Sequence, residues 1–277
     1  MTAATHRFSS LADAARAIVG TADLEEKKTF AHAAAGLWFK KSLSRTGTRH
    51  PQDMMPARPG RPEQPILLAP RDMPGRSTGG IRGRIALLHS LAHIELNAVD
   101  LTWDLIGRFA GENMPRSFFD DWVKVGLEEA KHFGLLQRRL EAYESHYGAL
   151  PAHDGLWEAT QETSHSLLAR LAILPLVLEA RGLDITPSIL KKLAAAGDIE
   201  SAKVLEIIYR DEKTHVAFGV KWFRFMCDKQ ALRADETFHH LVRKHFRGAL
   251  KPPFNDRARS QAGLTPGFYR PLMLTAP

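Results

Sequence analysis

The 277-residue sequence predicts an all-α fold built on four long helices. Apolar residues recur three and four positions apart over long stretches, which is the period of a helix with one buried face. No stretch of useful length alternates apolar and polar residues, as a half-buried strand would. Glycine and proline interrupt the periodic stretches where helices should end. The expected arrangement is therefore a helical bundle.

The N-terminal part, residues 1–79, is expected to hold additional helices and a wrapping segment. Residues 8–41 are predicted to form two helices separated near Gly20. From residue 42 to residue 80 proline, glycine and arginine dominate, which indicates an irregular stretch over the domain surface. The four long helices follow, over residues 81–111, 115–147, 157–182 and 198–228.

Two shorter helices complete the prediction. One begins at Thr186 and Pro187, which suit the N-cap and the first helical position. The other covers residues 234–247 and precedes an irregular C-terminal tail. We expect one domain over residues 1–277, with a four-helix core at 80–230 and a short helix and tail at 231–277.

Composition narrows the protein class. The 44% hydrophobic and 25% charged residues are typical of a soluble globular protein, and no apolar run approaches a membrane span. The N-terminus does not resemble a signal peptide. A single cysteine, Cys227, excludes an internal disulfide and favours a cytoplasmic location. The net charge of +7 permits nucleic-acid binding, but a solvated basic surface is preferred because no compact basic cluster occurs.

The motif Glu-x-x-His occurs four times, and its position on the helix faces separates the cases. Two copies replace core positions in apolar seams. In the second long helix that seam is Phe118, Trp122, Val125, Glu129, His132, Leu136. In the fourth it is Leu205, Ile208, Glu212, His215, Gly219, Trp222, Met226. Such spacing places each Glu–His pair on a buried face.

The first and third long helices each place a lone glutamate on a similar seam. The first seam is Leu88, Ala92, Glu95, Val99, Thr102, Ile106, Phe109, and the third is Leu168, Ala172, Leu176, Glu179, Leu183. Glu95 precedes Glu129 by 34 residues and Glu179 precedes Glu212 by 33. Each pair should meet in a helical hairpin, so the chain contains two versions of one module.

Buried acids on four helices require neutralisation, because an uncompensated buried carboxylate costs several kcal/mol. One Glu from each of two helices and Glu-x-x-His from each of the other two is the ligand set of ferritin-like di-iron and di-manganese sites. The predicted ligands of two iron ions, with manganese as the alternative, are Glu95, Glu129, His132, Glu179, Glu212 and His215. Glu129 and Glu212 are the expected bridges. Buried ion pairs with Lys or Arg are disfavoured because the seams lack basic residues at this level.

The remaining candidates have simpler interpretations. Glu162/His165 is expected on a solvated face and Glu236/His239 to point outward. His89 and His93 are expected to be structural, and Cys227 to be a small core residue. Pro175 either frees backbone carbonyls near the site or only bends its helix. Trp122 and Phe133 are expected to lie around the metals, where they would exclude water and shape a substrate cavity. Tyr209 is either a redox-active phenol or a packing residue.

The segments LAHIELNAVDLTWDL, EEAKHFGLL, LEARGLD and IYRDEKTHVAFG extend these motifs. With them the chain resembles a bacterial ferritin-like family, domain of unknown function 455, over most of its length. It is also similar, more distantly, to ferritin-like tRNA hydroxylases, which share the order of the ligand motifs. The resemblance implies that Glu128 and Asp211 hydrogen-bond ligand histidines of neighbouring helices, the alternative being ordinary exposed acids.

These observations predict a di-iron oxidase or monooxygenase that activates dioxygen to oxidise or hydroxylate a substrate. The alternatives are a ferroxidase or iron-handling protein, a tRNA-hydroxylase-like enzyme, or a metal-stabilised scaffold. A small molecule or RNA is the expected substrate, an electron-donor protein the expected partner, and a homodimer through exposed helix faces a candidate assembly.

Overall fold

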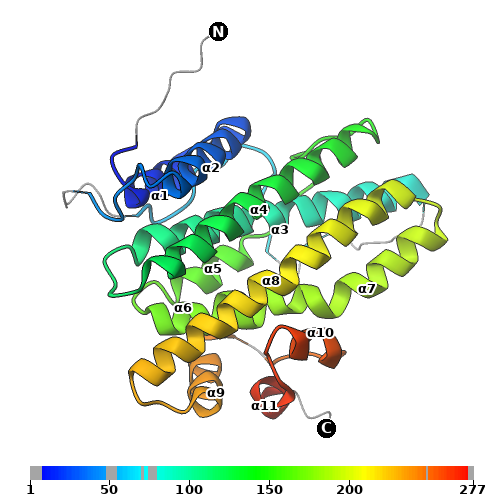
Figure 1. Cartoon of the computed structure of the whole chain (residues 1–277). Helices are drawn as coiled ribbons and strands as arrows, with labels where there is room; N and C mark the ends of the chain where they lie inside the picture. The colour runs from blue at the N-terminus through cyan, green and yellow to red at the C-terminus, as the bar shows by residue number, and fades with distance from the viewer. Residues whose placement is uncertain (1–7, 48–54, 70–71, 74–79, 248, 274–277) are drawn as a thin grey trace. The chain divides into compact units, whose positions relative to one another are not determined.

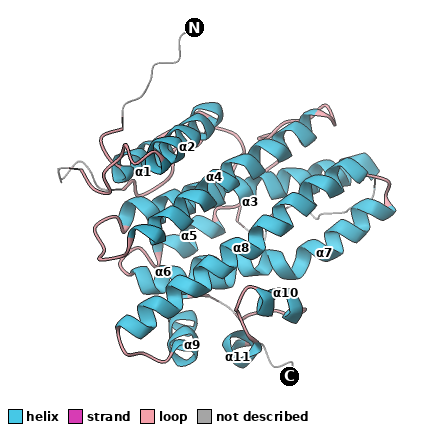
Figure 2. Cartoon of the chain, in the orientation of Figure 1, coloured by secondary structure: helices cyan, strands magenta, loops and turns pink. Residues whose placement is uncertain are grey.

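The computed structural model describes residues 8–47, 55–69, 72–73, 80–247 and 249–273, and these contain helices and no strand (Figure 2). The predicted all-α class is thus confirmed. The chain divides into two compact units, Met1–Trp157 and Glu158–Pro277. The single domain expected over residues 1–277 stays a prediction.

Two short and two long helices lie wholly within the described part of the first unit (Figure 1). They are α1 (Leu11–Gly20), α2 (Leu24–Phe39), α3 (Gly80–Arg108) and α4 (Arg116–Glu141). The side chains of Ser10 and Asp23 cap α1 and α2 by accepting from backbone N–H groups, which confirms two helices separated near Gly20. Helices α3 and α4 pack along each other, while α1 packs on α3 and α2 on α4.

Every residue predicted for the α3 and α4 seams is buried, so the helical phase expected from sequence is correct. Gly126 allows the two helices to approach. A Cβ added there would lie 2.7 Å from Trp103 Nε1. The close approach keeps the polar residues of both seams in one water-excluded layer.

The described parts of the predicted irregular segment lie against the first unit. The Gly60 amide donates to the carbonyl of Val19 at 2.8 Å, and the Trp157 indole donates to the carbonyl of Ala57 at 3.1 Å. The predicted segment also includes residues 48–54, 70–71 and 74–79, which lie outside the described residues. The part that is described therefore follows the surface of one unit.

A buried ionic group in the first unit was not predicted. The Lys27 ammonium donates to Asp100 at 2.5 Å and to the carbonyl of Ile18 at 2.9 Å, and Arg61 pairs with Asp100 at 2.6 Å. Burial lowers the pKa of Lys27, while the charge of Asp100 opposes that shift. The group connects α1, α2 and the irregular segment to α3.

The second unit is also helical. Helix α5 (Gly155–Gln161) crosses the boundary between the units. The unit continues through α6 (Leu167–Ile173), the π-helix η3 (Leu174–Glu179), α7 (Ala180–Ala195), α8 (Ile199–Lys229) and α9 (Ala234–His245). It ends with α10 (Asp256–Gln261), α11 (Pro266–Tyr269) and the 3-10 turn η4 (Arg270–Leu272).

The predicted third helix over residues 157–182 is interrupted, so its continuity was wrong. A turn over residues 162–166 separates α5 from α6, and Ser166 caps α6 through the amide of Ala169. Pro175 then lies inside a π-helical turn. Because proline has no N–H to donate, the helical ladder must change there, and π-turns are a common response that often marks functional sites.

The helix predicted to begin at Thr186 and Pro187 was also wrong, because α7 runs through Pro187 without a break. Proline cannot donate to the carbonyl of residue i−4, here Leu183. The side-chain amide of Asn255 donates to that carbonyl instead, at 3.2 Å. A partner distant in sequence thus allows the proline inside the helix.

The C-terminal tail is more ordered than predicted, since it contains α10, α11 and η4. Arg259 of α10 forms two hydrogen bonds to Asp184 of α7, at 2.8 and 2.7 Å, and both side chains are buried. The Asn255 side chain caps α10 and its backbone amide donates to Asp184. The prediction of an irregular tail was therefore wrong for these residues.

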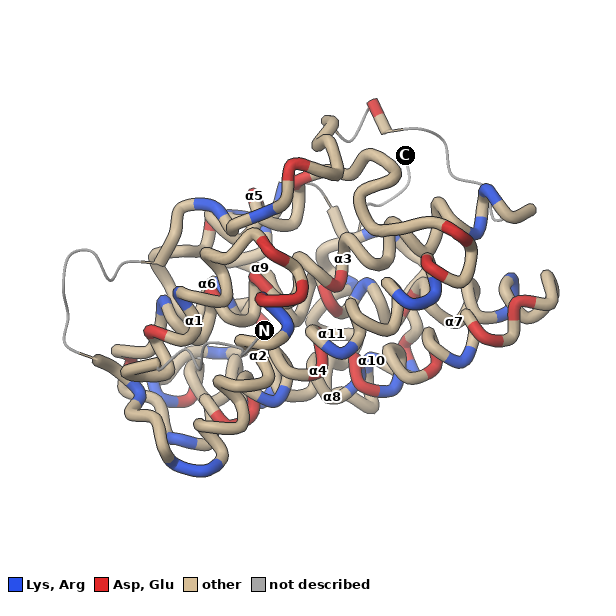
Figure 3. Tube along the Cα trace, turned by 90° about the horizontal axis from the view of Figure 1, so that it is seen from above, with Lys and Arg blue, Asp and Glu red and all other residues tan. Residues whose placement is uncertain are grey.

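Charged residues of both signs are distributed over the helices of the structure (Figure 3). Lys and Arg are spread along both units and are interleaved with Asp and Glu (Figure 3). Within the described ranges no helix is long and apolar enough to cross a membrane. Cys227 is fully buried, as predicted, and burial raises the pKa of its thiol to about 11, with the neighbouring Asp228 carboxylate adding to the shift.

Candidate metal centre

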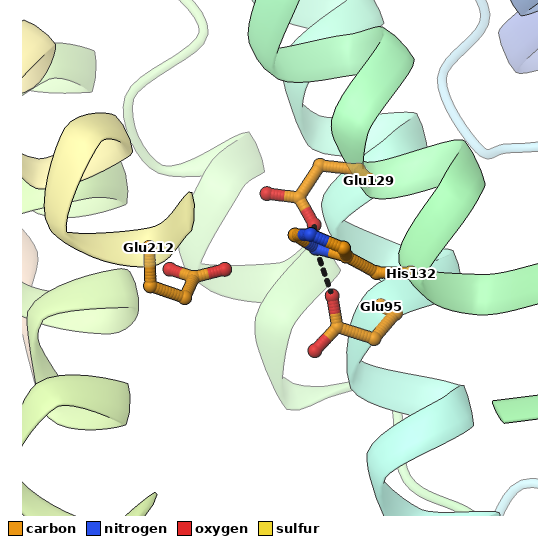
Figure 4. Close-up of side chains that lie close together, drawn as sticks. All are labelled: Glu95, Glu129, His132 and Glu212. Atoms are coloured by element: carbon orange, nitrogen blue, oxygen red, sulfur yellow. Dashed lines mark ion pairs between the residues drawn. The ribbon is translucent and has the colours of Figure 1, made fainter. Parts of the chain in front are cut away.

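The first unit brings together three of the predicted ligands. Glu95 comes from α3, whereas Glu129 and His132 come from adjacent turns of α4 (Figure 4). His132 Nδ1 lies 3.3 Å from Glu95 Oε2 and 3.4 Å from Glu129 Oε2. Glu129 and His132 are completely buried and Glu95 is 5% exposed. The fourth residue drawn in Figure 4, Glu212, belongs to the second unit.

The spacing of these atoms suits metal ligands better than hydrogen-bond partners. A good N–H···O bond measures about 2.7–3.2 Å between heavy atoms. Two ligand atoms each about 2.1 Å from one ion lie roughly 3.0–3.4 Å apart, depending on the coordination angle. The candidate ligand atoms of Glu95, Glu129 and His132 all lie within 4.8 Å of one another. Two carboxylates and one imidazole nitrogen form a donor set suited to iron or manganese.

The second unit repeats this arrangement. His215 Nδ1 lies 3.5 Å from Glu212 Oε1, three residues earlier on α8. His215 is fully buried and the Glu212 side chain is 12% exposed. Glu179 is the last residue of η3, and both of its carboxylate oxygens are buried.

The register of η3 against α8 indicates that Glu179 and His215 lie at one level. A Cβ added at Gly219 would lie 2.3 Å from Pro175 Cβ, so these two residues face each other. The consecutive helices run in opposite directions (Figure 1). One turn forward from Pro175 is Glu179, and one turn back from Gly219 is His215. The register of the two helices thus places Glu179 level with the Glu-x-x-His motif of α8.

Replacing Gly219 by alanine is expected to destabilise the protein by about 1–3 kcal/mol, because the new methyl group would overlap Pro175. Alanine is otherwise the better helix former, by about 1 kcal/mol. Gly182→Ala in α7 is the matched control, since nothing lies within 4 Å of its added Cβ. Urea denaturation measures both changes. Equal stability of Gly219→Ala and wild type would contradict the close packing of η3 on α8.

The acids preceding the two motifs differ in burial. Asp211 is buried and accepts a hydrogen bond from Arg210 Nε at 3.2 Å. Glu128 is partly exposed, with Lys124 Nζ at 4.0 Å. The hydrogen bonds to ligand histidines implied by the family resemblance stay a prediction. Burial fits Asp211 to such a role better than Glu128.

Tyr209 of α8 contacts the C-terminal tail. Its hydroxyl accepts from the Asn255 side-chain amide at 3.1 Å, and burial raises its pKa. Lys213 Nζ lies 4.5 Å from the ring centroid. These contacts support the packing interpretation, and a redox role of the phenol stays a prediction.

His89 and His93 have structural partners, as expected. His93 Nε2 lies 3.0 Å from the carbonyl of His153 and must donate, so Nδ1 accepts from the Tyr147 hydroxyl at 2.8 Å. Burial, with the charge of Arg61 adding to it, lowers the pKa of His93 to about 4. His89 Nε2 accepts from the Gly148 amide at 3.0 Å.

The two other Glu-x-x-His copies are on the surface. Glu162 and His165 are exposed in the turn before α6, rather than on a helix as expected. Glu236 pairs with Arg233 at 3.1 Å on the exposed face of α9, and His239 lies 2.9 Å from the carbonyl of Gly267. Trp122 and Phe133, expected near the metals, are fully buried on α4.

The contacts that attach the start of α7 to the C-terminal tail were not predicted from the sequence. The Arg259 guanidinium donates to the carbonyl of Ala180, directly after Glu179, at 3.3 Å. Arg181 donates to the carbonyls of Lys251 and Pro253 in the tail. Arg259 lies in a segment without helical periodicity, so no local signal marked it as buried.

Comparison with known proteins places the chain in a family. A family model described as "Protein of unknown function (DUF455)" matches residues 20–270, and the chain belongs to that family. An uncharacterized protein of Haemophilus influenzae is 41% identical over 222 residues, which cover 78% of this chain and 75% of the relative. No solved structure matches.

Proposed function

We propose that the two half-sites combine into one ferritin-like di-iron centre, with manganese as the alternative metal, and that the protein is an oxidase or monooxygenase. The observation that carries this proposal is the repetition of a buried Glu and Glu-x-x-His in both units. Each copy holds carboxylate and imidazole atoms 3.3–3.5 Å apart. The core of both units would then be a four-helix bundle made of α3, α4, η3 with α7, and α8.

Electrostatics supports a bound metal. Four carboxylates withdrawn from water strongly repel one another unless positive charge neutralises them. The imidazole of His132 pairs with Glu95 and Glu129, and that of His215 with Glu212; a neutral imidazole brings no positive charge to these carboxylates. Two divalent ions would supply four positive charges to four carboxylates.

The residues would have separate roles. Glu129 and Glu212 would be shared ligands of the two ions. His132 and His215 would each bind one ion. The apolar walls on α4, including Trp122 and Phe133, would exclude water. The iron pair, when bound, would supply the activation of dioxygen, and a monooxygenase reaction would also need two electrons from an external donor and two protons.

The first test is metal content. Protein produced with added iron should contain about two iron ions per chain, and these should be magnetically coupled in Mössbauer or EPR spectra. His215→Ala separates a joint centre from two independent sites. In a joint centre this variant loses coupling and also weakens iron binding at Glu95, Glu129 and His132. An uncoupled ion retained at full affinity in the first unit would contradict the joint centre.

The second test separates an oxygenase from iron handling. The anaerobically reduced protein should consume dioxygen without forming a mineral core when excess iron is added. Continued iron oxidation with mineral growth would favour the ferroxidase alternative. RNA or an apolar molecule that co-purifies with the protein would identify the substrate class and decide whether the likeness to tRNA hydroxylases extends to function.

A further inference from the structure

A surface hollow of the second unit gathers potential metal ligands from two elements. Its lining residues are Gln161, Glu162, His165, Lys244 and His245. The first three come from the end of α5 and the turn after it, and the last two from the last turn of α9. None of them is among the six proposed ligands of the di-iron centre.

The two imidazoles in this hollow are at the separation that one metal ion requires. The ring centroids of His165 and His245 lie 5.4 Å apart, and the ring planes are inclined by 48°. With metal–nitrogen bonds of about 2.0–2.1 Å, two imidazoles on one tetrahedral ion have centroids about 5 Å apart. The centroid separation of His165 and His245 is therefore close to that of two imidazoles on one ion.

A carboxylate is available as the third ligand. Glu162 now pairs with Arg247 at 3.2 Å, but the side chains are 50% and 92% exposed. An ion pair this exposed holds its carboxylate weakly, so Glu162 can turn to a competing cation. Burial lowers the pKa of His245, and nearby Lys244 acts in the same direction while Glu162 opposes it. The neutral imidazole is the form that binds metal.

We propose that Glu162, His165 and His245 form a peripheral site for one borderline divalent transition cation, Zn²⁺ in the first place, with water as the fourth ligand. Two imidazoles and one carboxylate are a donor set that zinc accepts, whereas Mg²⁺ and Ca²⁺ prefer oxygen ligands. The ion would fasten the turn after α5 to the end of α9. The site does not depend on the proposed di-iron centre.

The test is a Zn²⁺ titration of the full chain, produced without a histidine tag and monitored by competition with a chromophoric chelator. His165→Ala and His245→Gln should each remove one Zn²⁺ per chain or weaken its binding at least tenfold. His32→Ala is the control, because His32 is an exposed histidine on α2 of the first unit. Millimolar Mg²⁺ should not displace the ion. Substitution by Co²⁺ should give the absorption of a tetrahedral ion, lost in His165→Ala.

If the zinc stoichiometry and every affinity are the same in wild type, His165→Ala and His245→Gln, the proposal is overturned. His165 is exposed, so its replacement should not disturb folding, and the iron content of His165→Ala should equal that of wild type. That last measurement keeps this site separate from the buried centre, because either site can fail without the other.

Discussion

Glu129→Gln is expected to remove most of the stabilisation that iron or manganese gives to the protein, without destabilising the metal-free form. In the metal-free protein Glu129 is a fully buried carboxylate close to His132, on a layer that also contains Glu95. An amide of the same shape removes a charge whose burial is unfavourable. In the metal-loaded protein the same change removes a charged ligand.

The measurement is thermal or urea unfolding with and without metal. A metal at one hundred times its dissociation constant stabilises the wild type by about 2.7 kcal/mol, and Glu129→Gln should lose most of this gain. Glu141→Gln, an identical change at an exposed position of the same helix, should keep it. A large loss of stability in metal-free Glu129→Gln would instead indicate a structural ion pair, and an unchanged response to metal would exclude Glu129 as a ligand.

The helical seams could be predicted from sequence because helical phase is a local property. Apolar residues three and four apart mark the buried face, so Glu129 and His132 within such a row had to be buried as well. The structure agrees at every α3 and α4 seam position. The candidate ligands were found for the same reason, since chemically unfavourable residues stood at core positions.

Two features could not be predicted because they depend on a partner distant in sequence. Thr186 and Pro187 satisfy the local rules for a helix start, yet Asn255 satisfies the carbonyl that Pro187 leaves without a helical donor. Lys27 and Asp100 are 73 residues apart and each appears solvent-exposed in its own segment. Only the folded chain shows that such groups are buried together.

The π-turn before Glu179 is an intermediate case. Pro175 indicated in the sequence that the helix is perturbed there, but not that the perturbation is a π-turn. A π-turn inserts an extra residue and therefore rotates everything after it relative to everything before it. The seam predicted through Leu168 and Glu179 therefore crosses a change of helical phase.

Arg259→Met should destabilise the second unit by about 3 kcal/mol, because it removes the buried guanidinium that makes two hydrogen bonds to Asp184 and leaves only the longer, partly exposed contact from Arg181 at 3.5 Å among the ion pairs described for that carboxylate. The double variant Asp184→Leu with Arg259→Met should recover much of that loss, since replacing both members of a buried pair is far less costly than removing one. Recovery should be incomplete, because the backbone amide of Asn255 also donates to Asp184.

Arg270→Met is the matched control in the same tail. Arg270 pairs with Asp256 at 2.7 Å, but the two side chains are 60% and 45% exposed, so this change should cost less than about 1 kcal/mol. Urea denaturation measures all three variants, and limited proteolysis reports whether α10 has separated from α7. If Arg259→Met unfolds like Arg270→Met and its tail stays resistant to protease, the buried pair does not hold the tail. If instead the tail is cleaved while the rest of the chain stays folded, the docking of α10 on α7 depends on this pair. The hydrogen bond from Arg259 to the carbonyl of Ala180 is lost in the same variant.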